Sequence, residues 1–316
     1  MNIACAIDNN YIRHCAVMLR SLYEANPKEE IAVYIIHGDL DADEKEKLAA
    51  YLGKFLHSVN FVQIDPKTLE DFPVYGHLTL SAYYKLLIPT ALPADVHKAI
   101  FLDCDLIVVD SLVELWNTPL NVYPLATVTD QHIKENCQRL GLPESWGYFN
   151  TGVMLIDLDK WRRKDIISEG LKFAKGTQAV LKHCDQDILN HFFEGQWLHL
   201  DMRWNASPHL WGLCDIPAEE AAEFKAQNTE ARDNPAVIHF AGLGIAKPWN
   251  YKCKHPWKNS YLKLKKQTPW AGVPLESQPA PFLVRAWARL VFRLKCLLKD
   301  AFMSFSTKQF FKKEKK

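Results

Sequence analysis

Residues 99–105 read Ala-Ile-Phe-Leu-Asp-Cys-Asp, an apolar run that ends in two carboxylates. The apolar part predicts a buried β-strand. Because side chains alternate along an extended chain, we expect Asp103 and Asp105 to point to the same side where that strand ends. Ligands of open α/β sheets bind at the carboxyl ends of strands, and two hard oxygen donors there suit Mg²⁺ or Mn²⁺ with a phosphate-bearing ligand. The alternative is a solvated strand end or a turn.

The sequence on both sides of this strand alternates short apolar runs with helical patterns. Further strands are expected at residues 2–7, 31–37, 59–64, 125–129, 152–158 and 236–240. Helices are expected at residues 11–25, 41–52, 81–88, from about 160 onward, and 185–193. This alternation is typical of an α/β protein with a mostly parallel central sheet.

The chain has 316 residues, of which 48% are hydrophobic and 24% charged, the proportions of a folded protein. Its net charge of +1 hides an asymmetry. Residues 281–316 contain ten Lys or Arg and two Asp or Glu, a net charge of +8, whereas the other 280 residues carry −7. An acidic body with a basic end argues against nucleic acid as the partner and predicts a separate electrostatic partner for that end.

The eight cysteines form no Cys-x-x-Cys pair and no zinc-type spacing, and the chain is too long to need disulfide staples. We therefore expect a reducing, cytoplasmic compartment. The first apolar run has no basic region ahead of it, so we expect no signal peptide. Apolar segments all fall short of the roughly 20 residues that a membrane-spanning helix needs.

Three parts are expected along the chain, because the composition changes near Gln267, where prolines become frequent. We assign residues 1–266 to a folded domain, residues 267–280 to a proline-containing linker, and residues 281–316 to a tail.

The tail has the pattern of a basic amphipathic helix. Projected on a helix, one face gathers the apolar residues Leu283, Trp287, Leu290, Leu294, Leu297 and Ala301. The opposite face gathers Arg285, Arg289, Arg293, Lys295 and Lys299. Such a helix suits the plane of an anionic membrane surface. A helix docked on the folded domain would need only the apolar face, so the clustered positive charge favours the membrane.

His239 and the loop after it form a second candidate site. A histidine inside an apolar run is most often a hydrogen-bonded core residue, yet imidazole is also a ligand that could complete the set begun by the two aspartates. The glycines at 242 and 244 let backbone amides approach an anion, and the lysine at 247 suits a diphosphate. An ordinary surface turn explains this loop equally well.

Asp185-Gln186-Asp187 begins a predicted helix. Capping and the helix dipole explain one acid at that position. They explain the second acid and the glutamine less well, which leaves room for polar contacts to a sugar. Asn150-Thr151-Gly152 precedes a strand and could be only a turn.

Taken together, these residues resemble glycosyltransferase family 8, the retaining enzymes of the GT-A fold, and most closely its bacterial lipo-oligosaccharide galactosyltransferases. The resemblance covers nearly the whole folded domain and rests on motifs in a specific order. They are Asp8-Asn9-Asn10-Tyr11, Asp103-Cys104-Asp105, residues 148–153, Trp161-Arg162-Arg163, residues 185–190, and His239 through Lys247-Pro248-Trp249.

The resemblance implies which residues hold a UDP-sugar donor. The uridine ligands would be Asp8, Asn10 and Tyr11, with the tyrosine ring against uracil. The ligands of Mn²⁺, or of Mg²⁺ as the alternative ion, would be Asp103, Asp105 and His239. The diphosphate would also meet Lys85, which stands where relatives often have arginine, together with Gly242 and Lys247. Lys247 follows His239 by eight positions where close relatives have six, so that loop is two residues longer.

The resemblance also implies a sugar-binding end. The donor hexose would contact Asp130, Asn150, Asp185 and Gln186, the last two being the candidate catalytic residues. His77 would lie towards the acceptor.

The implied reaction is Mn²⁺-dependent transfer of galactose from UDP-galactose, with retention, to a sugar hydroxyl of a lipid-linked, lipopolysaccharide-type acceptor at the inner leaflet of the cell membrane. A UDP-glucose-dependent enzyme of the same family is the first alternative. A sugar nucleotidyltransferase is disfavoured, because Asp8-Asn9-Asn10-Tyr11 is not a glycine-rich basic loop. A non-catalytic, membrane-bound sensor of sugar nucleotides is the remote alternative.

Overall fold

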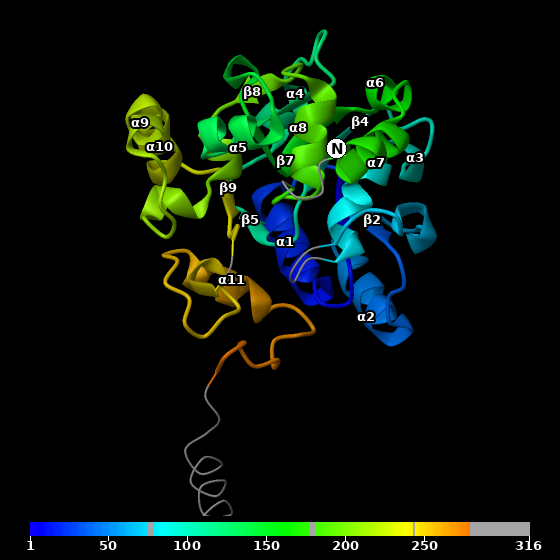
Figure 1. The fold of residues 1–316 in the computed structure, drawn as a ribbon. Coiled ribbons are helices and arrows are strands. Elements are labelled where there is room, and N and C mark those ends of the chain that lie inside the picture. The colour runs from blue at the N-terminus through cyan, green and yellow to red at the C-terminus, as the bar shows by residue number, and fades with distance from the viewer. Residues whose placement is uncertain (75–78, 177–180, 243, 279–316) are drawn as a thin grey trace, which may run out of the picture. The chain divides into compact units, whose positions relative to one another are not determined.

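The computed structural model describes residues 1–74, 79–176, 181–242 and 244–278 (Figure 1). Residues Met1–Val273 form one compact unit, and a second unit begins at Pro274. Within the described residues, no helix is long and apolar enough to cross a membrane.

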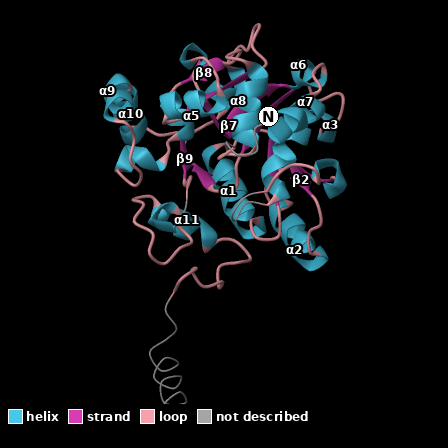
Figure 2. Cartoon of the chain, viewed as in Figure 1, coloured by secondary structure: helices cyan, strands magenta, loops and turns pink. Residues whose placement is uncertain are grey.

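The described strands and helices alternate along the chain (Figure 2). The strands are β1 (Asn2–Ile7), β2 (Ala32–His37), β3 (Ser58–Gln63), β4 (Lys98–Leu102), β5 (Leu106–Val108), β6 (Leu125–Thr129), β7 (Phe149–Asp157), β8 (Leu198–Leu200) and β9 (Val237–His239). The α-helices are α1 (Ile12–Ala25), α2 (Ala42–Leu52), α3 (Ile88–Ala91), α4 (Val113–Asn117), α5 (Ile133–Leu140), α6 (Leu158–Arg162), α7 (Ile166–Gly176), α8 (Asp185–Phe193), α9 (Ala218–Glu223), α10 (Lys225–Asp233) and α11 (Lys258–Lys265).

Seven strands form the central sheet, in the order β3-β2-β1-β4-β7-β6-β8. Four of the six neighbouring pairs are parallel, and β7 runs antiparallel to both β4 and β6. The mostly parallel α/β architecture expected from the sequence is therefore confirmed. The strands β5 and β9 pair with each other in a separate antiparallel sheet.

The sheet is buried on both faces. Successive residues of a strand point to opposite faces, and the residues on each face pack into a different core cluster. Along β1, Ile3 and Cys5 belong to the cluster that includes residues of α1 and α2, whereas Ala4 belongs to the cluster on the other side. Phe101 and Leu102 of β4 divide in the same way. A third cluster joins β9, Trp249 and α11.

The structure departs from the expected elements at several places. Residues 80–87 form a 3₁₀ helix, η2, before α3 begins at Ile88. β7 begins at Phe149, three residues earlier than expected. The strand expected at residues 236–240 is only β9, and it pairs outside the central sheet. Residues 267–273, which the sequence analysis gave to the linker, belong to the compact unit, since Trp270 is buried and its indole donates to Glu44.

Candidate functional site

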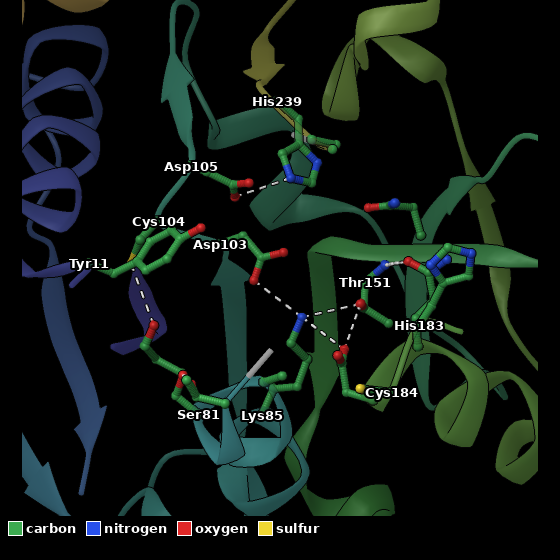
Figure 3. A pocket seen from close by; sticks show the side chains of 18 of the residues that line it. Tyr11, Ser81, Lys85, Asp103, Cys104, Asp105, Thr151, His183, Cys184 and His239 are labelled. Atoms are coloured by element: carbon green, nitrogen blue, oxygen red, sulfur yellow. Dashed lines mark hydrogen bonds and ion pairs between the residues drawn. The ribbon is translucent and has the colours of Figure 1, made fainter. Parts of the chain in front are cut away.

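A cavity of about 590 Å³ opens at the carboxyl ends of β1 and β4, and it gathers residues from across the folded unit (Figure 3). Most residues predicted for the site line this one cavity. They are Asp8, Asn10, Tyr11, Lys85, Asp103, Asp105, Asn150, Asp185, Gln186, His239, Gly242 and Lys247. Asp130 is joined to the cavity wall by hydrogen bonds with Asn150 and Gln186. His77 lies outside the described residues.

Backbone pairing brings the two aspartates and the histidine together. β4 ends at Leu102, and the Asp103 amide then donates to the Gly152 carbonyl oxygen at 2.8 Å. β5 begins three residues later, and its first residue, Leu106, pairs with His239 of β9. The carbonyl of Asp105 accepts from the Phe240 amide at 2.9 Å. His239 thus lies beside Asp105 although 134 positions separate them in the chain.

Asp103, Asp105 and His239 each offer one ligand atom, and these atoms lie within 4.8 Å of one another. His239 Nε2 is 3.2 Å from Asp105 Oδ1, a contact that is marked by a dashed line in Figure 3. His239 Nδ1 is 2.8 Å from the side-chain oxygen of Asn205, which accepts its proton. Nε2 then presents a lone pair to a carboxylate oxygen, and two acceptors at that distance need a proton or a cation between them. These donor atoms fit a divalent cation.

Two asparagine amides, joined by hydrogen bonds that all run in the same direction, determine which ring nitrogen of His239 carries the hydrogen. Asn205 Nδ2 donates to Asn150 Oδ1 at 2.8 Å, and Asn150 Nδ2 donates to Asp130 Oδ2 at 2.9 Å. A carboxylate only accepts hydrogen bonds, so Asp130 fixes the orientation of both amides. The last oxygen in this series of hydrogen bonds, Oδ1 of Asn205, faces His239 Nδ1, so Nδ1 must carry a hydrogen. This series therefore keeps Nε2 free for a ligand.

Gly152 is required beside this histidine. A Cβ at position 152 would lie 2.3 Å from Cε1 and 2.6 Å from Nδ1 of His239. These distances are far shorter than any real carbon contact, and the imidazole is buried, so a side chain there would displace it. The sequence Asn150-Thr151-Gly152 is thus a structural support of the site as well as part of its wall.

Two buried lysines neutralise the two aspartates. Lys85 Nζ lies 3.2 Å from Asp103 Oδ1 and 3.0 Å from Asp185 Oδ2. Lys247 Nζ contacts Asp105 Oδ2. Burial works against the charged forms, but Asp103 and Asp185 raise the pKa of the Lys85 ammonium, and the Lys247 ammonium holds the pKa of Asp105 well below its usual range. Both lysines are charged and stand where an anion would enter.

Gln186 and Asp185 lie at the start of α8, and both line the cavity. Gln186 Nε2 donates to Asp130 Oδ2 at 2.7 Å, and its Oε1 accepts from the Thr151 amide at 3.2 Å. The Asp185 carboxylate accepts from the Thr151 hydroxyl at 2.8 Å. Burial raises the pKa of Asp185, although the Lys85 charge opposes this. Both side chains are held in place by the protein.

Asp187, the third residue of that motif, is fully buried. It accepts two hydrogen bonds at 2.8 Å from the Arg139 guanidinium, one from the Tyr148 hydroxyl, and two from the backbone amides of residues 182 and 183. These contacts fix the chain just before Asp185. The role of Asp187 is to hold the start of α8 against α5 and β7.

The end of the cavity next to α1 is organised around Asp8. One oxygen of its carboxylate accepts from the Asn10 and Tyr11 amides, at 2.9 and 3.2 Å. The other accepts from the hydroxyls of Thr79 and Ser81, at 3.1 and 3.2 Å. This carboxylate therefore shapes the loop from β1 to α1 and ties it to η2.

The family model for glycosyl transferase family 8 matches residues 2–253, a span that contains every described side chain of the cavity. The chain belongs to glycosyltransferase family 8. It is a glycosyltransferase of the GT-A fold, and the resemblance drawn from its sequence motifs is confirmed.

Named relatives agree with this assignment. General stress protein A of Bacillus subtilis (strain 168) is 31% identical over 274 residues, which cover 85% of this chain and 94% of that protein. A lipopolysaccharide 1,3-galactosyltransferase of Salmonella typhimurium is 24% identical over 302 residues, covering 93% and 86%. The crystal structure of the galactosyltransferase LgtC with donor and acceptor sugar analogues has a TM-score of 0.74 and 28% identity, and it covers 90% of this chain and 99% of that one.

Family 8 enzymes generally use a divalent metal ion, and Asp103 with Asp105 is the DxD-like group of this chain. Sequence reasoning missed Asn205, Thr79 and Ser81, which support this site from irregular segments and a 3₁₀ turn. Asn205 ends a short 3₁₀ helix, η5 (Met202–Asn205), in a stretch without a motif. Only its contact with His239 reveals its role.

We predict that Asn205→Leu weakens Mn²⁺ binding by about tenfold or more, since the tautomer of His239 is then no longer held. Asn205→Asp keeps an acceptor for Nδ1 but loses the hydrogen that Asn150 accepts, so we expect it to retain more affinity than the leucine variant and less than the wild type. Titration of free Mn²⁺ followed by electron paramagnetic resonance measures this. Equal affinity in the leucine variant and the wild type, with unchanged thermal unfolding, would show that Asn205 does not position the histidine.

Proposed function

We propose that this family 8 glycosyltransferase transfers galactose from UDP-galactose, with retention, to a sugar hydroxyl of a lipopolysaccharide-type acceptor. The observation that carries the proposal is the meeting of Asp103, Asp105 and His239 in the same cavity as two charged lysines. This combination suits a cation and a diphosphate bound together. A galactosyltransferase solved with donor and acceptor analogues is 28% identical to this chain, which supports galactose as the donor sugar.

We infer that the metal is Mn²⁺, because two carboxylates with one imidazole suit it better than they suit Mg²⁺, which prefers oxygen ligands alone. Held by Asp103, Asp105 and His239, the ion would supply positive charge to the departing diphosphate.

The lysines bind the leaving group in this proposal. Lys85 and Lys247 are now paired with carboxylates, and the same ammonium groups face the cavity where a diphosphate would lie. Lys85 is a point charge and does not form the planar fork of an arginine. Asn10 and Tyr11 line the other end, where the Tyr11 ring stands nearly perpendicular to the Trp249 ring and would offer a face to uracil.

The sugar end is polar and rigid. Asp130 accepts from both Gln186 and Asn150, so these three groups form a fixed set of oxygen and nitrogen atoms for the hydroxyls of a hexose. Asp185 is held beside them by the hydrogen bond that it accepts from the Thr151 hydroxyl. Nothing in this set separates galactose from its C4 epimer glucose by charge, so UDP-glucose is the alternative donor.

We propose that the reaction proceeds by attack on the same face from which UDP departs. The acceptor oxygen bonds to the anomeric carbon as the bond from that carbon to UDP breaks, and a UDP phosphate oxygen takes the acceptor's proton. A double displacement would need a carboxylate next to the anomeric carbon. Gln186 has an amide, a poor nucleophile, and both of its polar ends are already held by Asp130 and Thr151. Its role in the proposal is electrostatic and positional.

We predict that Gln186→Ala lowers turnover by about a hundredfold to a thousandfold without abolishing it, as expected for loss of one stabilising group. Gln196→Ala, at an exposed position, is the matched control and retains wild-type turnover. Mass spectrometry of wild-type enzyme during turnover is expected to find only unmodified protein. A trapped covalent glycosyl-enzyme, with complete loss of activity in Gln186→Ala, would overturn front-face attack.

The donor is tested by a screen in which UDP release is measured with Mn²⁺ and each common UDP-sugar, with and without a lactose-terminated acceptor. We predict that UDP-galactose gives the fastest release and that chelation of the metal stops it. Asp103→Asn lowers release by at least about a hundredfold, since one charged ligand is lost, whereas the exposed Asp43→Asn has no effect. Faster release from UDP-glucose would establish the alternative donor. Binding without turnover of any UDP-sugar would favour a non-catalytic sensor.

We infer from the sequence that residues 281–316, which lie outside the described residues, attach the enzyme to the inner leaflet. Their net charge of +8 and their tryptophan-containing apolar face suit an anionic bilayer, where a lipid-linked acceptor would be found. The boundary at 280, where the tail begins, belongs to the same proposal, whereas the folded unit continues to Val273.

We predict that the full chain sediments with vesicles containing phosphatidylglycerol and stays in solution with phosphatidylcholine alone. Binding weakens as salt is raised, because exposed charges are screened. A chain ending at residue 280 is expected no longer to bind the vesicles, while it keeps its turnover on a soluble acceptor. If the shortened chain still sedimented with anionic vesicles, the tail would not be the membrane contact.

A further inference from the structure

Three cysteines from separate parts of the chain converge behind the DxD group. Cys5 lies on β1, Cys15 on α1, and Cys104 between Asp103 and Asp105. Their sulfur atoms lie within 4.8 Å of one another, and all three thiols are free. Cys5 and Cys15 are fully buried, and Cys104 is 4% exposed. We call these residues the thiol trio.

The spacing of the trio matches a metal site. The sulfur atoms of Cys5 and Cys15 are 3.8 Å apart. Two thiolates that each lie about 2.3 Å from a tetrahedral ion are about 3.8 Å apart. Weak S–H···S hydrogen bonds, which also join Cys104 to Cys5 and to Cys15, explain the spacing equally well, and binding of a thiophilic ion separates the two explanations. The third sulfur, from a loop 89 residues beyond Cys15, completes one face of a coordination polyhedron.

The trio lies directly behind the cavity that holds the two aspartates. Cys104 is among the residues that line this cavity and is 4% exposed, so an ion would reach the trio from the cavity past this residue (Figure 3). A metal site needs such an entry path as well as the correct ligands. The other two sulfurs lie deeper, in the core cluster on the α1 side of the sheet.

We propose that Cys5, Cys15 and Cys104 form a second metal site, selective for soft, thiophilic ions of the Zn²⁺, Cd²⁺ and Cu⁺ class. The site is distinct in ligand type from the Asp103, Asp105 and His239 group, whose oxygen and imidazole donors suit Mn²⁺. Cys104 stands between Asp103 and Asp105 in the chain, and its side chain points away from theirs because successive side chains of an extended chain alternate. The two sites therefore lie on opposite sides of this segment. Coordination replaces S–H protons, which leave to solvent, with metal–sulfur bonds, and the ion's charge offsets that of the thiolates.

In the test, Cd²⁺ is added to the full chain without any sugar nucleotide. Excess Mg²⁺ is present to occupy the oxygen-containing site. The background protein carries Cys214→Ser, Cys253→Ser and Cys296→Ser, which removes the exposed Cys214, the partly exposed Cys253, and Cys296, which lies outside the described residues. Two readouts are taken: the ultraviolet sulfur-to-cadmium charge-transfer absorption, and the metal content after desalting. Neither depends on transferase activity, so the result is independent of the proposed function.

We predict that the background protein binds one Cd²⁺ per chain with charge-transfer absorption. Adding Cys15→Ser weakens binding by about tenfold or more. Adding Cys137→Ala, at a buried cysteine outside the trio, leaves binding unchanged. Because Cys15→Ser could disturb the core, Cys15→Ala is tested beside it, and thermal unfolding is measured for each variant. Absence of charge-transfer absorption in the background protein, or equal absorption in folded Cys15 variants, would overturn the proposal.

Discussion

The site depends on the Asp130 carboxylate, which accepts hydrogen bonds from both ends of the cavity. On one side it orients Gln186 directly, and on the other it orients His239 through Asn150 and Asn205. A carboxylate can only accept hydrogen bonds, so each side-chain amide that donates to it can take only one orientation. Asp130 therefore links Gln186 with the group of Asp103, Asp105 and His239, although Asp130 itself is not among the residues that line the cavity.

Two ion pairs balance the like charges of the aspartates at the cavity. Asp103 and Asp105 would repel one another, but Lys85 and Lys247 each pair with one of them. Because both lysines also line the cavity, they are suitable partners for the anion of the proposed function. The ion pairs are buried, so salt screens them much less than it screens pairs on the surface.

Most of the fold and much of the candidate site could be predicted from the sequence, because both rest on local patterns. The apolar run before Asp103 and the acids opening α8 are contiguous signals, and the structure has strand and helix at those positions. The pairing of β5 with β9 could not be read in the same way, since each has only three residues. A strand that short shows no reliable period. Asn205 was missed for a related reason, because its function arises from a contact 34 residues away in the chain.

Cys104 illustrates how one short motif can serve two environments. Asp103 and Asp105 face the cavity, and the residue between them belongs to the core that contains Cys5 and Cys15. An apolar residue of similar size would fill that space as well, since a buried thiol packs as a small hydrophobic group. Packing alone therefore does not require three sulfur atoms at one point. The convergence of three thiols from β1, α1 and the loop after β4 is a chemical feature, and it places soft ligands within one residue of hard ones.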